Sequence, residues 1–112
     1  MRDFISALAL AAALMVFSPI ARAADVVPKF DIPRNCKAET ADASGVGESV
    51  ASCTQDEERA RQKLAEQWDQ FAKEDKSVCI RATSLDGTPS CVELQTCLEM
   101  ATDNRARLKG SR

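Results

Sequence analysis

The chain has 112 residues, with five cysteines but no histidine and no tyrosine. Without histidine, the Ser-His-Asp and Cys-His arrangements of nucleophilic catalysis cannot form, and most catalytic zinc sites lose their imidazole ligands. The formal net charge of −2 argues against nucleic acids and anionic lipids as partners. A chain of this length forms one small domain that buries little surface and commonly needs covalent cross-links. We therefore expect a non-enzymatic protein.

Residues 1–23 have the pattern of a secretory signal peptide. Arg2 precedes an apolar run from Phe4 to Phe17, and the small-residue site Ala21-Arg22-Ala23 follows, which is the usual order of a charged region, an apolar region and a cleavage site. The apolar run is shorter than the ~20 residues that a membrane-spanning helix needs, although an uncleaved anchor is the competing interpretation. We expect cleavage after Ala23, a periplasmic or secreted location, and no stable membrane span in the mature chain.

The mature chain expected after cleavage, residues 24–112, keeps all five cysteines. Loss of Arg2, Arg22 and Asp3 leaves 13 basic and 16 acidic residues, a net charge of −3. This mild negative charge suits a basic protein partner better than a nucleic acid. Because disulfides persist in exported compartments, the cysteines are candidates for cross-links.

Residues 24–52 predict an irregular, partly mobile lead-in. This segment contains Pro28, Pro33, Gly45 and Gly47 among many small residues, and it has neither a helical nor an alternating apolar period. We therefore place a helical hairpin domain over residues 53–109 and a frayed tail over residues 110–112.

A long amphipathic helix is expected from Gln55 to Cys79. Thr54 and Glu57 have the spacing of a capping box, and the helix dipole explains the acidic cluster 56–58, for which a catalytic carboxylate pair is the competing interpretation. The apolar stripe at helical spacing consists of Ala60, Leu64, Trp68, Phe71, Val78 and Ala82.

A second helix is expected from Pro89 to about Leu108. Asp86-Gly87 predicts a turn, and Pro89 suits a first helical turn capped by Thr88. The second apolar stripe consists of Cys91, Leu94, Cys97, Leu98, Ala101 and Leu108. Since the two stripes can face each other, the predicted fold class is all-α: an antiparallel helical hairpin stapled by disulfides, with an irregular N-terminal lead-in.

Asp75 interrupts the first apolar stripe between Phe71 and Val78. One interpretation is a buried acid with a functional purpose. The other is a helix irregularity, or a carboxylate that pairs with Arg105 on the second helix. We favour the structural interpretation.

The five cysteines allow several arrangements of two disulfides with one cysteine left over. Cys91 and Cys97 cannot readily pair within one helix, because six residues give ~9 Å of rise and ~240° of rotation, but either can approach Cys79. A bond between Cys36 and Cys53 would pin the lead-in to the first helix and contribute roughly 3 kcal/mol. Since the chain has no C-x-x-C pair, we expect no zinc, and we expect no other metal or cofactor.

The segment from Cys53 to Met100 resembles a group of small exported proteins from α-proteobacteria, rhizobial ones especially, with no established function. The likeness consists of a cysteine followed by an acidic cluster, Trp and Phe three positions apart, an Asp before a second cysteine, and then G-T-P-S, E-L and T-C-L-E-M. In that group the position of Cys91 is usually tyrosine. The resemblance implies that Cys79 and Cys97 are the framework pair and that Cys91 is the unpaired thiol.

A looser resemblance is to the LprI-type lysozyme inhibitors, which are also small, exported, helical and disulfide-bonded. The shared pattern is an aromatic pair, Cys, a Gly-containing turn, Cys-Leu and Thr-x-x-Arg. It is matched here by Trp68, Phe71, Cys79, Gly87, Cys97, Leu98, Thr102 and Arg105. The resemblance implies an inhibitor of a cell-wall lytic enzyme such as lysozyme, and we take Trp68, Phe71 and Arg105 as candidate partner contacts.

Two further hypotheses follow from the residues. The lead-in and the charged helices fit a periplasmic stress protein with holdase-like chaperone activity. An unpaired Cys91 in a first helical turn could support redox chemistry if its thiol pKa were lowered, although burial against Leu94 and Leu98 is the interpretation we favour. Because a two-helix core is thin, we expect part of the apolar stripe to face a periplasmic or extracellular protein, or a second copy of the chain in a homodimer.

Overall fold

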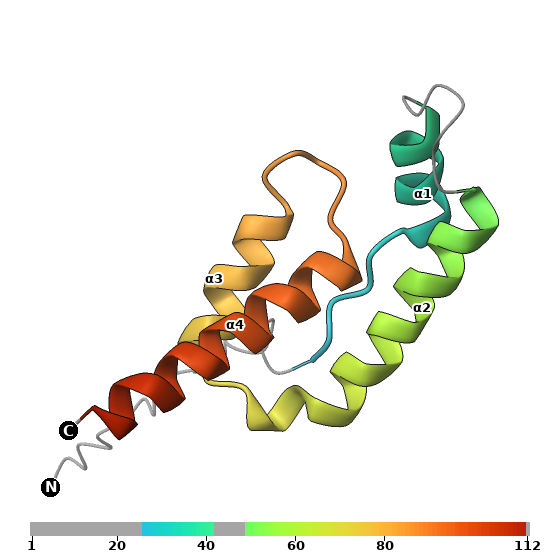
Figure 1. Ribbon diagram of the computed structural model, residues 1–112. Coiled ribbons are helices and arrows are strands. Elements are labelled where there is room, and N and C mark those ends of the chain that lie inside the picture. Colours follow the sequence, from blue (N-terminus) through green and yellow to red (C-terminus); the bar gives the residue numbers. More distant parts are fainter. Residues whose placement is uncertain (1–25, 42–48, 112) are drawn as a thin grey trace, which may run out of the picture.

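A computed structural model describes residues 26–41 and 49–111, which fold as an all-α protein (Figure 1). The described elements are α1 (Ile32–Ala41), α2 (Val50–Gln67), the short 3-10 helix η2 (Trp68–Gln70), α3 (Lys73–Thr83) and α4 (Cys91–Gly110). The predicted signal peptide lies outside the described residues. Within the described ranges, no helix is both long enough and apolar enough to cross a membrane.

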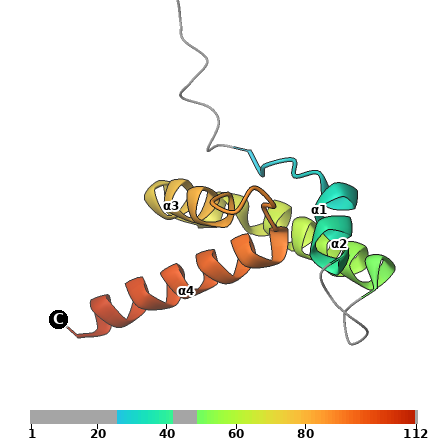
Figure 2. The same ribbon diagram turned by 90° about the horizontal axis from the view of Figure 1, so that it is seen from above.

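The helices are arranged as two hairpins that meet along one interface (Figures 1 and 2). α1 packs against α2, α3 packs against α4, and α2 packs against α4. We call α1, α2 and η2 the N-terminal hairpin, and α3, α4 and the turn between them the C-terminal hairpin. The interface between the two hairpins, formed mainly by α2 and α4, is called the seam. This arrangement confirms the predicted all-α helical hairpin. It adds α1, which forms a second hairpin with α2 on the N-terminal side.

Each hairpin is cross-linked by its own disulfide. Cys36 is bonded to Cys53 and joins α1 to α2, while Cys79 is bonded to Cys97 and joins α3 to α4. The Cα atoms are 5.7 Å apart in both disulfides, within the range that a disulfide needs. Both predicted pairs are confirmed, and the remaining cysteine, Cys91, is free.

The hydrophobic core lies mainly along the seam. Its buried side chains include Ala60, Leu64 and Trp68 on one side and Cys91, Leu94 and Leu98 on the other. Full burial of one leucine contributes about 1.5–3 kcal/mol. The predicted apolar stripes of the two helices therefore do face each other as far as Trp68 and Leu98.

The single helix expected from Gln55 to Cys79 is wrong, because the chain leaves helical geometry at Phe71 and Ala72. Both residues have extended backbone, with φ −80° and ψ 143° at Phe71 and φ −65° and ψ 140° at Ala72. The break resets the helical face, so that α3 buries Lys76, Cys79 and Thr83. Val78, expected in the core, is 56% exposed.

Tertiary packing explains the break better than local sequence does, since neither proline nor glycine marks it. The break lets α3 fold back beside η2, where the Lys76 ammonium lies 5.0 Å from the centroid of the Trp68 ring. This cation–π contact covers the indole, and both side chains are buried. The buried lysine is thus a consequence of the break and is not visible in the apolar pattern.

α2 begins earlier than predicted, at Val50. The Ser49 hydroxyl is its N-cap and accepts from the Ser52 N–H at 3.0 Å. The Thr54 hydroxyl donates instead to the Val50 carbonyl at 2.7 Å. The predicted capping box of Thr54 and Glu57 is therefore wrong, because both residues lie inside the helix.

The predicted turn between the last two helices is confirmed. Gly87 has φ 81°, and the Asp86 carboxylate accepts from the Thr88 N–H at 2.9 Å, which lowers the pKa of Asp86. α4 starts later than predicted, at Cys91, because Ser90 rather than Thr88 is its N-cap and accepts from the Glu93 N–H.

The segment predicted to be an irregular lead-in contains a helix, α1. Pro33 lies in its first turn, where a missing N–H loses no intrahelical hydrogen bond. Ile32, Asn35 and Cys36 form a buried face that is too short to stand out as a periodic pattern. At the other end α4 continues through Gly110, and the Ser111 N–H donates to the Arg107 carbonyl, so helical structure extends into the tail predicted to be frayed.

Candidate binding groove

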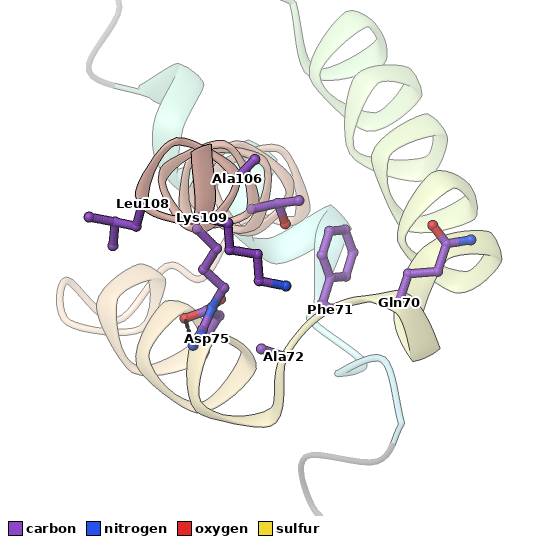
Figure 3. Close-up of a pocket in the computed structure, with 9 residues that line it drawn as sticks. Gln70, Phe71, Ala72, Asp75, Ala106, Leu108 and Lys109 are labelled. Carbon is purple, nitrogen blue, oxygen red and sulfur yellow. Dashed lines mark hydrogen bonds and ion pairs between the residues drawn. The ribbon is translucent and has the colours of Figure 1, made fainter. Parts of the chain in front are cut away.

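An open groove of about 690 Å³ lies between the start of α3 and the C-terminal half of α4 (Figure 3). α4 has 20 residues and α3 only 11, so α4 continues past the helices that cover its first half. Every residue from 102 to 111 is exposed, and Figure 2 shows α4 running away from α1 and α2 toward this free end. We call residues 102–111 the projecting end of α4.

The apolar part of the groove comes from the linker and from α4. Phe71 is half-buried, packs partly against the core, and points its ring into the groove (Figure 3). Ala72 lines the groove beside it, and Leu108 lies across from it with 61% of its surface exposed. An aromatic side chain held at the edge of the core is a suitable anchor for a partner.

An ion pair forms the charged wall of the groove. The Arg105 Nε donates to Asp75 Oδ2 at 2.6 Å and the Arg105 Nη2 donates to Asp75 Oδ1 at 3.0 Å, a two-pronged geometry that strengthens the contact. These hydrogen bonds lower the pKa of Asp75 and raise the pKa of Arg105. The predicted pairing of Asp75 with Arg105 is confirmed.

Lys109 is the third charged residue that lines the groove, and its side chain points into it (Figure 3). Since Asp75 balances Arg105, Lys109 makes the charge of the lining side chains positive. Arg107 adds a further basic side chain on the projecting end of α4. The projecting end of α4 thus carries three basic residues and one acidic residue, Asp103. Within it, Arg105 is paired with Asp75 and also contacts Glu74 at 3.9 Å.

The three side chains predicted as partner contacts lie in two places. Phe71 and Arg105 both line the groove, so the structure brings them together. Trp68 is only 3% exposed and belongs to the core. In the folded conformation Trp68 is therefore a core packing residue.

The burial of Glu57 and its contacts with α4 were not predicted from the sequence. It is 6% exposed, and its carboxylate accepts from the Ser90 hydroxyl at 2.5 Å and from the Cys91 N–H at 2.6 Å. A weaker contact reaches the Val92 N–H at 3.5 Å. Glu57 of α2 therefore satisfies the free N–H groups at the start of α4 and places a negative charge at the positive end of that helix.

The neighbouring acids of the cluster 56–58 have ordinary surface roles. Asp56 pairs with Arg59 at 3.4 Å, and Glu58 pairs with Arg61 at 3.3 Å. These are exposed contacts between residues three positions apart on one helix. The cluster is therefore explained by ion pairs and by the buried contact of Glu57. In the part of the chain that the structure describes, no three potential ligands gather as a metal site.

Cys91 is fully buried at the first position of α4. Burial, together with the Glu57 carboxylate beside it, raises the pKa of its thiol to about 12. A reactive thiol needs a lowered pKa and access to solvent. Cys91 has neither in this conformation, which favours the structural interpretation over redox chemistry.

Comparison with protein-family models, curated proteins and solved structures found no match for this chain.

Proposed function

We propose that this chain is a small, exported, non-enzymatic binding module that inhibits a cell-wall lytic enzyme such as lysozyme. The observation that carries the proposal is the projecting end of α4, which is exposed throughout and bears the basic residues Arg105, Arg107 and Lys109. Glycoside hydrolases use a pair of carboxylates that flank the bond to be cut. A basic helix end is therefore complementary in charge to the cleft of such an enzyme.

The rest of the molecule supports this role by holding the helix end in place. The Cys79–Cys97 disulfide ties α4 to α3, and the buried first half of α4 anchors it in the core. A rigid element loses little conformational entropy when it binds. Phe71 supplies an aromatic anchor beside the helix end, and the two disulfides are consistent with an oxidising compartment.

The test is a titration of the mature protein, residues 24–112, against a chicken-type lysozyme, with lysis of a cell-wall substrate as the readout. We expect inhibition at micromolar protein. Reversal of one interface charge by Lys109→Glu should weaken it by about tenfold or more. The control is Lys63→Glu, the same change at an exposed lysine of α2, which should leave inhibition unchanged.

Two results contradict the proposal. Absence of inhibition at micromolar protein removes lysozymes of this type as targets. Equal weakening by Lys109→Glu and Lys63→Glu shows that overall charge, and not the projecting end of α4, determines binding.

A holdase-like stress protein is the second candidate, and the observation that favours it is the apolar seam between two hairpins that no disulfide connects. Separation of the hairpins would present Leu64, Trp68 and Leu98 to an unfolded client. An apolar dye should then gain fluorescence as the pH falls to about 2, where carboxylates are protonated, and the protein should suppress aggregation of a client. An unchanged dye signal contradicts this candidate.

A further inference from the structure

The strongest ties in the molecule lie within the hairpins. The two disulfides join α1 to α2 and α3 to α4. The two-pronged ion pair of Asp75 and Arg105 also lies inside the C-terminal hairpin. The two helices of each hairpin therefore stay covalently linked when the hairpins separate.

Several buried polar side chains make contacts between the hairpins, and the Ser90 hydroxyl is among them. Glu57 of α2 accepts from the start of α4. Asn35 of α1 donates through Nδ2 to the Pro89 carbonyl at 2.7 Å. Lys76 of α3 lies over the Trp68 ring of η2. Together with the apolar core, the seam is held by contacts that can separate without breaking a covalent bond.

The peptide link between the hairpins has the geometry of a hinge. Phe71 and Ala72 are the two extended residues between η2 and α3. The Phe71 N–H still donates to the Trp68 carbonyl, and the Ala72 carbonyl accepts from the Lys76 N–H, so the non-helical link is limited to the dihedral angles of these two residues. A few residues at element ends are enough to absorb the backbone rotation of an opening motion. Rotation here would move the hairpins as rigid bodies.

We propose that the molecule opens along the seam as two disulfide-tied hairpins that turn about Phe71 and Ala72. The open state exposes the apolar faces of both hairpins, and closing is directed by the Glu57 carboxylate at the start of α4. The inference concerns the seam alone and does not depend on the groove or on lysozyme.

Chemical modification of the Cys91 thiol can report this opening. It is fully buried at the seam, directly beside Glu57, and it is the one thiol of the five cysteines that is not in a disulfide. An alkylating reagent can therefore modify it only when the seam opens or when the whole protein unfolds. The two routes differ in how strongly denaturant accelerates them, since the acceleration scales with the surface exposed.

The experiment measures the rate of Cys91 alkylation in the mature chain with both disulfides intact, at several low denaturant concentrations. We expect slow labelling whose dependence on denaturant is clearly weaker than that of global unfolding. Glu57→Gln removes the charge at the start of α4 while keeping the shape of the side chain, and should accelerate labelling by about tenfold or more.

Asp75→Asn is the matched control. It is the same change from acid to amide and removes a two-pronged contact, but that contact lies within one hairpin. It should leave the labelling rate unchanged. If Glu57→Gln does not fold, Asn35→Ala replaces it, because it removes another hydrogen bond across the seam and should accelerate labelling in the same way.

Two results overturn the inference. One is labelling at the rate of global unfolding, with the full denaturant dependence. The other is an equal effect of the seam variant and Asp75→Asn, which would show that Cys91 reports general stability and not separation of the hairpins.

Discussion

The two ends of α4 belong to one helix but have opposite surroundings. In the first half Cys91, Leu94 and Leu98 are fully buried, whereas every residue of the projecting end is exposed. The side of α4 that faces the core continues past Leu98 through Arg105 to Lys109, at helical spacing, but the helices that cover it end sooner. The length of the neighbouring helices therefore decides where the core ends and a binding surface can begin.

The largest effect is expected from a matched pair of leucine substitutions in the two halves of α4. Leu94→Ala removes a fully buried side chain and should lower the free energy of unfolding by about 2–5 kcal/mol. Leu108→Ala makes the same change on the projecting end and should alter it by less than about 0.5 kcal/mol. Chemical denaturation of the two variants measures both values, and equal losses would contradict the division of α4 into a buried and a projecting half.

Removal of each disulfide should affect the two hairpins differently. Cys79→Ala with Cys97→Ala, and Cys36→Ala with Cys53→Ala, should each lower the free energy of unfolding by about 3 kcal/mol in the chain-entropy model. Only the first pair frees α4 from α3, and it alone should disturb the contact of Arg105 with Asp75. The NMR signal of the Arg105 Nε–H reports this contact. If both pairs of substitutions shift that signal alike, the groove does not depend on the C-terminal hairpin alone.

The smallest predicted effect is the pH dependence of the stability that the Asp75–Arg105 pair contributes. The effect is small because both side chains remain partly in contact with water. Arg105 lowers the pKa of Asp75 below its ordinary value of 3.8. The pair therefore stabilises the folded state at pH values above 3.8, and the stabilisation is lost as the pH falls through the lowered pKa. Thermal denaturation should show that the difference between the native chain and Asp75→Asn shrinks as the pH falls from about 5 to 2. A difference that grows toward acid pH would contradict this assignment.

Much of the fold follows from local sequence pattern. The helical periods around Leu64 and Leu94 and the turn at Gly87 are local features, and the structure confirms them. The interruption of helix at Phe71 and Ala72 is not marked by proline or glycine, and its visible consequence is the contact of Lys76 with the Trp68 ring. α1 escaped prediction because its buried face spans only Ile32 to Cys36.

The candidate site was predictable in part. The pairing of Asp75 with Arg105 follows from an acid that interrupts an apolar stripe, and the resemblance to known exported proteins implied the bond between Cys79 and Cys97. Glu57 was assigned to its own helix because a capping box is a local pattern. Its actual partners lie on α4, at a distance along the chain that no spacing rule covers.

The claim that the projecting end of α4 is the binding surface is tested most directly by NMR of the mature protein during titration with a chicken-type lysozyme. Amide signals of residues 70–75 and 102–109 should shift or broaden as lysozyme is added, while those of Leu94 and Leu98 stay in place. Changes confined to α1 and α2, or no change at saturating lysozyme, would contradict the claim.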